Sequence, residues 1–138
     1  LYALTHLNPT IEYGVTFERG TVVEYGDRAQ AFISGTASID NKGRVVHVGD
    51  IVRQTHRMWE NVDALLAEAE MNLTDHAAQI TVYLRDTADY VTVRDLFAAR
   101  FPHVPTIITL APVCRPEWLI EMECIAVADR HNETYRPF

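Results

Sequence analysis

The sequence predicts an α+β fold, in which a mixed β-sheet carries two long helices on one of its faces. Several segments are rich in β-branched and aromatic residues, and two others repeat apolar residues every three or four positions; their order is strand, strand, short strand, helix, strand, helix, strand, strand. Two helices can cover only one face of such a sheet, so the opposite, partly apolar face needs another partner. We expect the sheet faces of several copies to pack together.

The first half of the chain contains a hairpin and the longer helix. Two β-rich runs, 15–25 and 29–39, are separated by residues typical of a turn, and a short strand is expected over 44–48. Asp50 then has the character of a helix N-cap. The apolar stripe over 51–69 predicts a helix of about five turns.

The second half alternates strands with one more helix. The segment 77–84 reads as a strand, and a second helix is expected to start within 85–87 and to end at Pro102. Two further strands are expected over 106–112 and 118–128.

Length and composition indicate one domain. The 138 residues, 48% of them apolar, suffice for a single core, which we place in residues 1–128, with a polar C-terminal tail over 129–138. The chain opens with Leu1 rather than Met. We therefore expect the natural protein to begin earlier.

Charge and cysteine content exclude several classes of function. A net charge of -7 argues against a nucleic-acid binder, which needs a basic face. No run is long and apolar enough for a membrane span, and the first residues do not combine a basic segment with an apolar core, so we expect a soluble protein that is not exported. The two cysteines lack metal spacing and suit reduced thiols in a cytoplasmic protein. We expect no metal and no cofactor.

Two acids on an otherwise apolar strand are the first candidates for chemistry. At the strand period of two, Glu121 and Glu123 share a face with apolar neighbours. Such carboxylates must be paired, solvated in a cleft or used, because burying an isolated charge is costly. Ion pairs with arginines are one reading, and a pair of acids flanking a scissile bond is another. Glu121, which is closer to the preceding bend, is the stronger candidate for a functional role.

That bend contains a guanidinium and a thiol. Arg115 stands beside Pro116, which cannot join a strand ladder, so it is fixed on an irregular segment. Such an arginine suits bidentate capture of a substrate carboxylate, or else it staples the carbonyls of a turn. Cys114 has no histidine obviously placed to activate it, so we favour a thiol that shapes a pocket.

Small residues near the first hairpin allow a ligand to approach the backbone. Ser34 and Gly35 lie in the run ISGTAS, which has no phosphate-loop spacing. Tyr13 and Arg19 offer a phenol and a second guanidinium near the start of the chain.

Taken together, these segments resemble the Rid family, also called the YjgF family, from about Tyr13 to Ala128. The matching pieces are ISGTASI (33–39), GDIVRQTHRMWENVDALLAEA (49–69), QITVYLRDTADYVTVRDLFAARFP (79–102) and EMECIAVA (121–128). The resemblance implies a chorismate-mutase-like α+β barrel. It also implies a homotrimer with sheets inside, helices outside and ligand clefts between subunits.

The enamine/imine deaminases of this family hold the substrate carboxylate with an arginine just after the proline that opens the penultimate strand. A glutamate on their last strand positions water, and it matches Glu121. The arginine has no match, because Pro105 is followed by Thr106 and Ile107.

A second resemblance is to the Rid-like domain of chorismatases, carried by VCRPEWLIEMEC (113–124) and YGVTFERG (13–20). It implies that Glu121 is the acid for an enolpyruvyl ether and that Cys114 influences the product. Arg19 and Arg115 would hold the two carboxylates of the substrate. Chorismatases carry another domain before this one, so the resemblance implies a missing N-terminal domain of the same protein as a partner.

The leading hypothesis from the sequence is thus a chorismatase-type hydrolase domain acting on a small carboxylate ligand, with Glu121 as the acid. One alternative is an imine deaminase in which Arg115 replaces the missing arginine. Another is a non-catalytic ligand-binding or trimer-assembly domain.

Overall fold

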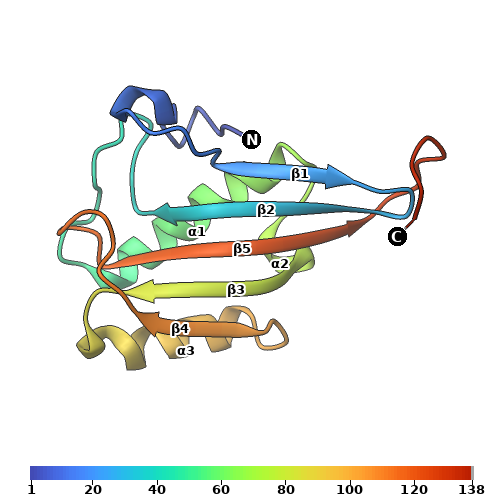
Figure 1. Cartoon of the computed structure of the whole chain (residues 1–138). Coiled ribbons are helices and arrows are strands. Elements are labelled where there is room, and N and C mark those ends of the chain that lie inside the picture. The colour runs from blue at the N-terminus through green and yellow to red at the C-terminus, as the bar shows by residue number, and fades with distance from the viewer. Residues whose placement is uncertain (138) are drawn as a thin grey trace.

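A computed structural model describes residues 1–137 as a five-stranded mixed sheet with its helices packed on one face (Figure 1). The strands, in the spatial order β1-β2-β5-β3-β4, are β1 (Gly20–Glu24), β2 (Arg28–Ala37), β5 (Ile120–Asp129), β3 (Ala77–Leu84) and β4 (Thr106–Leu110). The helices are α1 (Ile51–Ala67), α2 (Leu73–His76) and α3 (Tyr90–Arg100), with 3-10 turns η1 (Thr10–Tyr13) and η2 (Thr87–Asp89). The α+β class and the mixed sheet with both long helices on one face are confirmed.

The pairing of the strands follows from their connections. β1, β2, β5 and β3 pair antiparallel in that order, whereas β3 and β4 pair parallel. A parallel pair needs a crossover, which α3 supplies between β3 and β4. No helix in the described part of the chain is long and apolar enough to cross a membrane.

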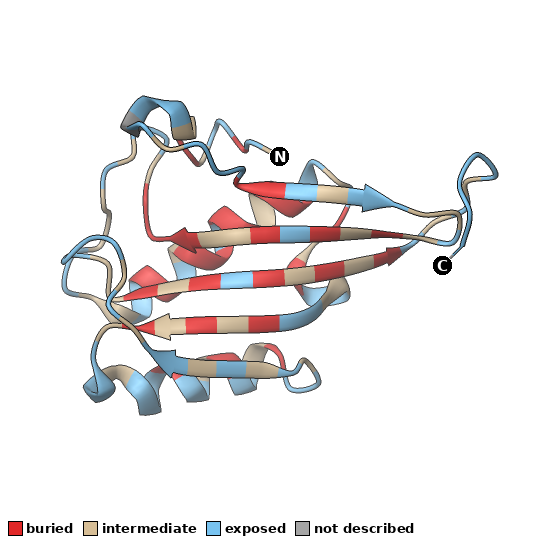
Figure 2. Ribbon diagram, viewed as in Figure 1, coloured by how far each residue is buried: buried red, intermediate tan, exposed pale blue. Residues whose placement is uncertain are grey.

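The two faces of the sheet differ in burial. On β5, Ile120, Met122 and Cys124 are buried beneath the helices, whereas the residues between them are partly or fully exposed (Figure 2). This alternation is the strand period of two that the sequence predicts. The helix face holds the core, and the opposite face, which carries the side chains of Glu121 and Glu123, has no helix over it (Figure 1).

The long helix begins where the sequence predicts. The side chain of Asp50 accepts a hydrogen bond from the backbone N–H of Arg53 at 3.0 Å, which satisfies one of the free donors at the start of α1. The second helix begins with the 3-10 turn η2, because the Asp86 carboxylate accepts from the N–H of Ala88, two residues on. The regular α3 therefore starts only at Tyr90.

Two predicted strands are wrong in part. The first strand starts at Gly20 rather than at residue 15, because β2 bulges after Ile33 and residues 15–19 leave the ladder there. The segment 44–48 forms only one isolated bridge, since His47 adopts a left-handed φ of 60° that ends extended structure.

The C-terminal tail packs against the β1–β2 turn of its own chain. The N–H of Asn132 donates to the carbonyl of Gly26 at 2.9 Å, and the N–H of Gly26 donates to the carbonyl of Arg136 at 3.1 Å. Phe138, the last residue of the predicted tail, lies outside the described residues.

Candidate functional site

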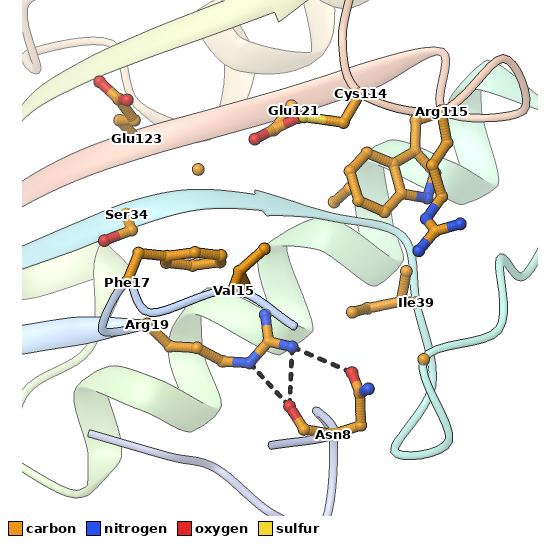
Figure 3. Close-up of a pocket in the computed structure, with 14 residues that line it drawn as sticks. Asn8, Val15, Phe17, Arg19, Ser34, Ile39, Cys114, Arg115, Glu121 and Glu123 are labelled. Carbon is orange, nitrogen blue, oxygen red and sulfur yellow. Dashed lines mark hydrogen bonds between the residues drawn. The ribbon is translucent and has the colours of Figure 1, made fainter. Parts of the chain in front are cut away.

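A pocket of about 590 Å³ opens where the bulge of β2 meets the start of β5 (Figure 3). It brings together six of the seven residues that the sequence singles out as candidates. Its lining consists of Asn8, Val15, Phe17, Arg19, Ser34, Gly35, Ala37, Ile39, Gly43, Cys114, Arg115, Trp118, Glu121 and Glu123. The seventh candidate, Tyr13, ends η1, and its side chain is outside what the structure describes.

Glu121 occupies space that only a glycine leaves open. The register of β2 against β5 shifts between Ile33 and Thr36, so Ser34 and Gly35 form a bulge beside the two acids. A Cβ atom on Gly35 would overlap Oε1 of Glu121 and would lie 3.1 Å from its Cδ. Gly35 is therefore needed for the close approach of a carboxylate, and not for a left-handed backbone.

The Glu121 carboxyl has no partner among the described residues: no hydrogen bond or ion pair to it is formed there. Burial, and secondarily the charge of Glu123, raise the pKa of Glu121 above its ordinary value. A carboxyl with a raised pKa can both accept and donate a proton nearer to neutral pH. The position of Glu121 thus fits a proton-transfer role.

Glu123 has a different environment from Glu121. It is exposed, and it accepts a hydrogen bond from the hydroxyl of Tyr83 at 3.0 Å. Among the described residues no arginine pairs with either acid, so the ion-pair reading of the two glutamates is not the one that the structure adopts.

Arg85 fixes the loop that carries Cys114 and Arg115. Its Nη2 donates to the carbonyls of Val113 at 2.7 Å and Arg115 at 2.6 Å, and its Nε donates to the carbonyl of Trp118 at 3.0 Å. One guanidinium at the end of β3 thus binds both sides of the bend. Nothing in the sequence indicates this role, since Arg85 is far from the loop in the chain and has no motif of its own.

Gln54 holds the same loop from the helix side. This buried residue of α1 donates to the carbonyl of Glu117 at 2.9 Å and accepts from the N–H of Leu119 at 3.0 Å. The only signal in the sequence is a polar residue beside the apolar stripe of the helix. Together with Arg85 it connects the bend to the core through hydrogen bonds.

Arg115 itself is available to a ligand. Its side chain is exposed, and the guanidinium lies 5.7 Å from the ring centre of Trp118. Among the described residues the guanidinium has no hydrogen-bond partner, although the backbone carbonyl of Arg115 accepts from Arg85. A guanidinium held over an aromatic face keeps its donors free for a carboxylate. Cys114, next to it, carries an exposed free thiol that points to the side of the pocket where Glu121 lies (Figure 3).

Arg19 is part of the pocket wall and is already engaged. It is buried, and it donates to the backbone oxygen of Asn8 from Nε at 3.0 Å and from Nη2 at 2.7 Å, as Figure 3 shows. Its Nη2 also donates to Oδ1 of Asn8 at 3.0 Å. Ser34 uses its hydroxyl to donate to the carbonyl of Glu18 at 2.6 Å. These four hydrogen bonds hold the segment 15–19 over the pocket.

Comparisons with known proteins agree with this fold. The family model described as Endoribonuclease L-PSP matches residues 21–128. A RutC family protein of Pyrococcus abyssi is 35% identical over 97 residues, which are 69% of this chain and 76% of that protein. The 3-aminoacrylate deaminase RutC of Acinetobacter baylyi is 32% identical over 97 residues, again 69% of this chain and 76% of that protein.

A solved structure shows the same fold. The YjgF gene product of Escherichia coli has a TM-score of 0.72 and 23% identity, over 91% of this chain and 95% of that chain. Because the family model matches most of the chain and both relatives align over 76% of their length, this chain belongs to the Endoribonuclease L-PSP family, within the Rid (YjgF) superfamily.

Proposed function

We propose that the chain is a hydrolytic deaminase of enamine or imine acids, with Glu121 moving the protons and Arg115 holding the substrate carboxylate. The observation that carries this proposal is an unpaired carboxyl with a raised pKa, in a pocket that also presents an unpaired guanidinium. Ionisable groups with perturbed pKa values gather at functional sites, which makes this pair a candidate for one.

In the proposed reaction, water adds to the carbon of the C=N bond. Glu121 takes a proton from the water as the C–O bond forms and passes it to the nitrogen, which gives a carbinolamine. Glu121 then takes the hydroxyl proton as the C=O bond forms and passes it to the nitrogen, which leaves as ammonia when the C–N bond breaks. The products are a 2-oxo acid and ammonia. An enamine first takes a proton on carbon and loses one from nitrogen to give the imine, and we assign this step to Glu121 as well.

Relatives support the deaminase over the chorismatase type that led the sequence analysis. A relative with 32% identity is named for deamination of 3-aminoacrylate, an enamine acid. The arginine that family deaminases carry after the proline of the penultimate strand is replaced here by Thr106 and Ile107 at the start of β4. We propose that Arg115 takes its place, since its donors are free and Arg85 fixes its backbone.

The test is hydrolysis of an imino acid made in place by an amino-acid oxidase, with semicarbazide present to trap imine that escapes. The wild type should lower semicarbazone formation. Glu121→Gln should lose at least ~10²-fold in rate, because general acid–base catalysis contributes about that much or more. Glu123→Gln, the matched control, should keep most of the activity.

A parallel assay with chorismate follows release of pyruvate. Pyruvate release from chorismate without imine hydrolysis would overturn the proposal in favour of an enolpyruvyl hydrolase. Equal imine hydrolysis by wild type and Glu121→Gln would remove Glu121 from the mechanism.

We also propose that the chain assembles as a homotrimer through its open sheet face, which we define by Val23, Phe32, Ile107, Ile125 and Val127. The first three of these are exposed, at 37%, 42% and 60%, on a face without helices. Covering apolar side chains of this size favours association. Sedimentation should give a trimer for the wild type and a smaller species for Phe32→Glu; a wild-type monomer at micromolar concentration would contradict the proposal.

A further inference from the structure

From the size and lining of the pocket we infer that the substrate is an imino acid with a bulky apolar side chain, rather than a three-carbon acid. This inference rests on the proposed deaminase function and adds the identity of the group attached to the reacting carbon. The relevant features are the volume of the pocket, its apolar wall and the position of that wall across the pocket from Glu121.

The pocket is too large for the smallest acids of this class. Its volume is about 590 Å³, inside the range of roughly 300–1,000 Å³ that is typical of sites for drug-sized ligands. A three-carbon imino acid would leave most of that space to water.

One wall of the pocket offers apolar contact. It is formed by Val15, Phe17 and Ile39, and Figure 3 shows these side chains across the pocket from Glu121. Phe17 is 41% exposed even though it is a large aromatic residue. A ligand side chain lying on this wall would remove apolar surface of both partners from water.

The two charged groups without a hydrogen-bond partner among the described residues, Arg115 and Glu121, lie away from Val15 and Phe17 (Figure 3). Arg115, which lies over Trp118, and Glu121 define a side for the carboxylate and for the reacting carbon. With the carboxylate on Arg115 and the C=N carbon beside Glu121, the third substituent of that carbon is directed toward the apolar wall. Hydrolysis is unchanged by that substituent: water supplies the oxygen, the C–N bond breaks and ammonia leaves.

The segment 15–19 is held in place to form this wall. It lies outside the sheet, and Ser34 fixes it by donating to the carbonyl of Glu18. A contact surface built on a fixed segment selects for the shape of a side chain with little loss of conformational freedom.

The experiment compares imino acids generated by D-amino-acid oxidase from D-alanine and from D-phenylalanine at matched oxidase flux. The configuration of the amino acid is irrelevant, because the imino carbon is planar. We expect kcat/KM of the wild type to be at least ~10-fold higher for the phenylalanine product, since apolar pockets discriminate by about that much per small group.

A filling substitution tests the wall directly. Val15→Phe should lower the ratio of the two kcat/KM values about tenfold or more, whereas Val91→Phe, an exposed site on α3 away from the pocket, should leave the ratio unchanged. Circular dichroism and thermal unfolding verify that both variants fold.

The outcomes separate the inference from the function on which it rests. Hydrolysis of both imino acids at similar rates, or faster hydrolysis of the alanine product, would overturn the bulky substrate and leave the deaminase intact. A preference for the phenylalanine product that Val15→Phe does not change would overturn the assignment of the wall. Hydrolysis of neither would overturn the proposed function, and this inference with it.

Discussion

Replacing Gly35 by alanine should inactivate the site without unfolding the protein. The added methyl would overlap Oε1 of Glu121 and would lie 3.1 Å from Cδ and 3.6 Å from Cγ. The backbone of β2 can stay in place, because Gly35 has no left-handed φ, and the far end of the Glu121 side chain can rotate away. The carboxylate must then move by more than ~1 Å to restore ordinary contact distances.

The expected size of the effect follows from that displacement. A misplacement of about 1 Å reduces rates by ~10²-fold, equivalent to about 2.7 kcal/mol of transition-state stabilisation. Alanine is more favourable than glycine in a strand by roughly 0.5–1 kcal/mol, so the free energy of unfolding should stay equal or rise slightly. Activity and stability are therefore expected to change in opposite directions.

The assay is imine hydrolysis by Gly35→Ala beside its thermal unfolding curve. In a Glu121→Gln background the same substitution should have little further effect on the rate, because the group that it displaces no longer transfers protons. Wild-type activity in a folded Gly35→Ala protein would refute the reasoning. So would a fall in melting temperature of many degrees, which would show that the strand itself and not the carboxylate had moved.

Three further predictions concern the acid, the thiols and the loop. Because the pKa of Glu121 is raised in the folded state, its contribution to stability is fully present below its ordinary pKa of 4.5 and is lost as the pH rises through the folded-state pKa. Glu121→Gln should therefore melt at a higher temperature than wild type at pH 7 to 8, and the difference should shrink below pH 4.5. A difference in melting temperature that does not depend on pH would contradict this. Burial raises the pKa of Cys124 to about 12, so a thiol reagent at pH 8 should modify Cys114 quickly and Cys124 only on unfolding, as mass spectrometry of the labelled peptides would show; rapid loss of both thiols would be the contrary result. Arg85→Met removes three hydrogen bonds to the loop and should raise KM by about tenfold or more, because Arg115 is then misplaced. Arg85→Lys should recover part of the wild-type KM. An unchanged KM in Arg85→Met would show that the loop does not contribute to substrate binding.

Local patterns in the sequence predict the regular elements well. The helix cap at Asp50 and the alternation along β5 depend on neighbours within a few residues, and both are as expected. The placement of Glu121 on the face without helices follows from the same alternation. The resemblance of the quoted segments to the Rid family predicts membership of that superfamily, which the comparisons confirm.

What the sequence does not predict depends on distant partners. The segment 15–19 has the composition of a strand, but a bulge in β2 diverts it over the pocket. The hydrogen bonds of Arg85 to Val113, and of Gln54 to Glu117, join residues that are far apart in the chain. No spacing rule connects such pairs, so the rigidity of the loop that carries Arg115 is visible only in the folded chain.

In the proposed reaction an unpaired Glu121 carboxyl transfers the protons of imine hydrolysis. This role is tested by kcat/KM of wild type and Glu121→Gln for one imino acid, measured with both proteins shown to be folded. We expect Glu121→Gln to lose ~10²-fold or more of the wild-type kcat/KM. Equal values for the two proteins would contradict it.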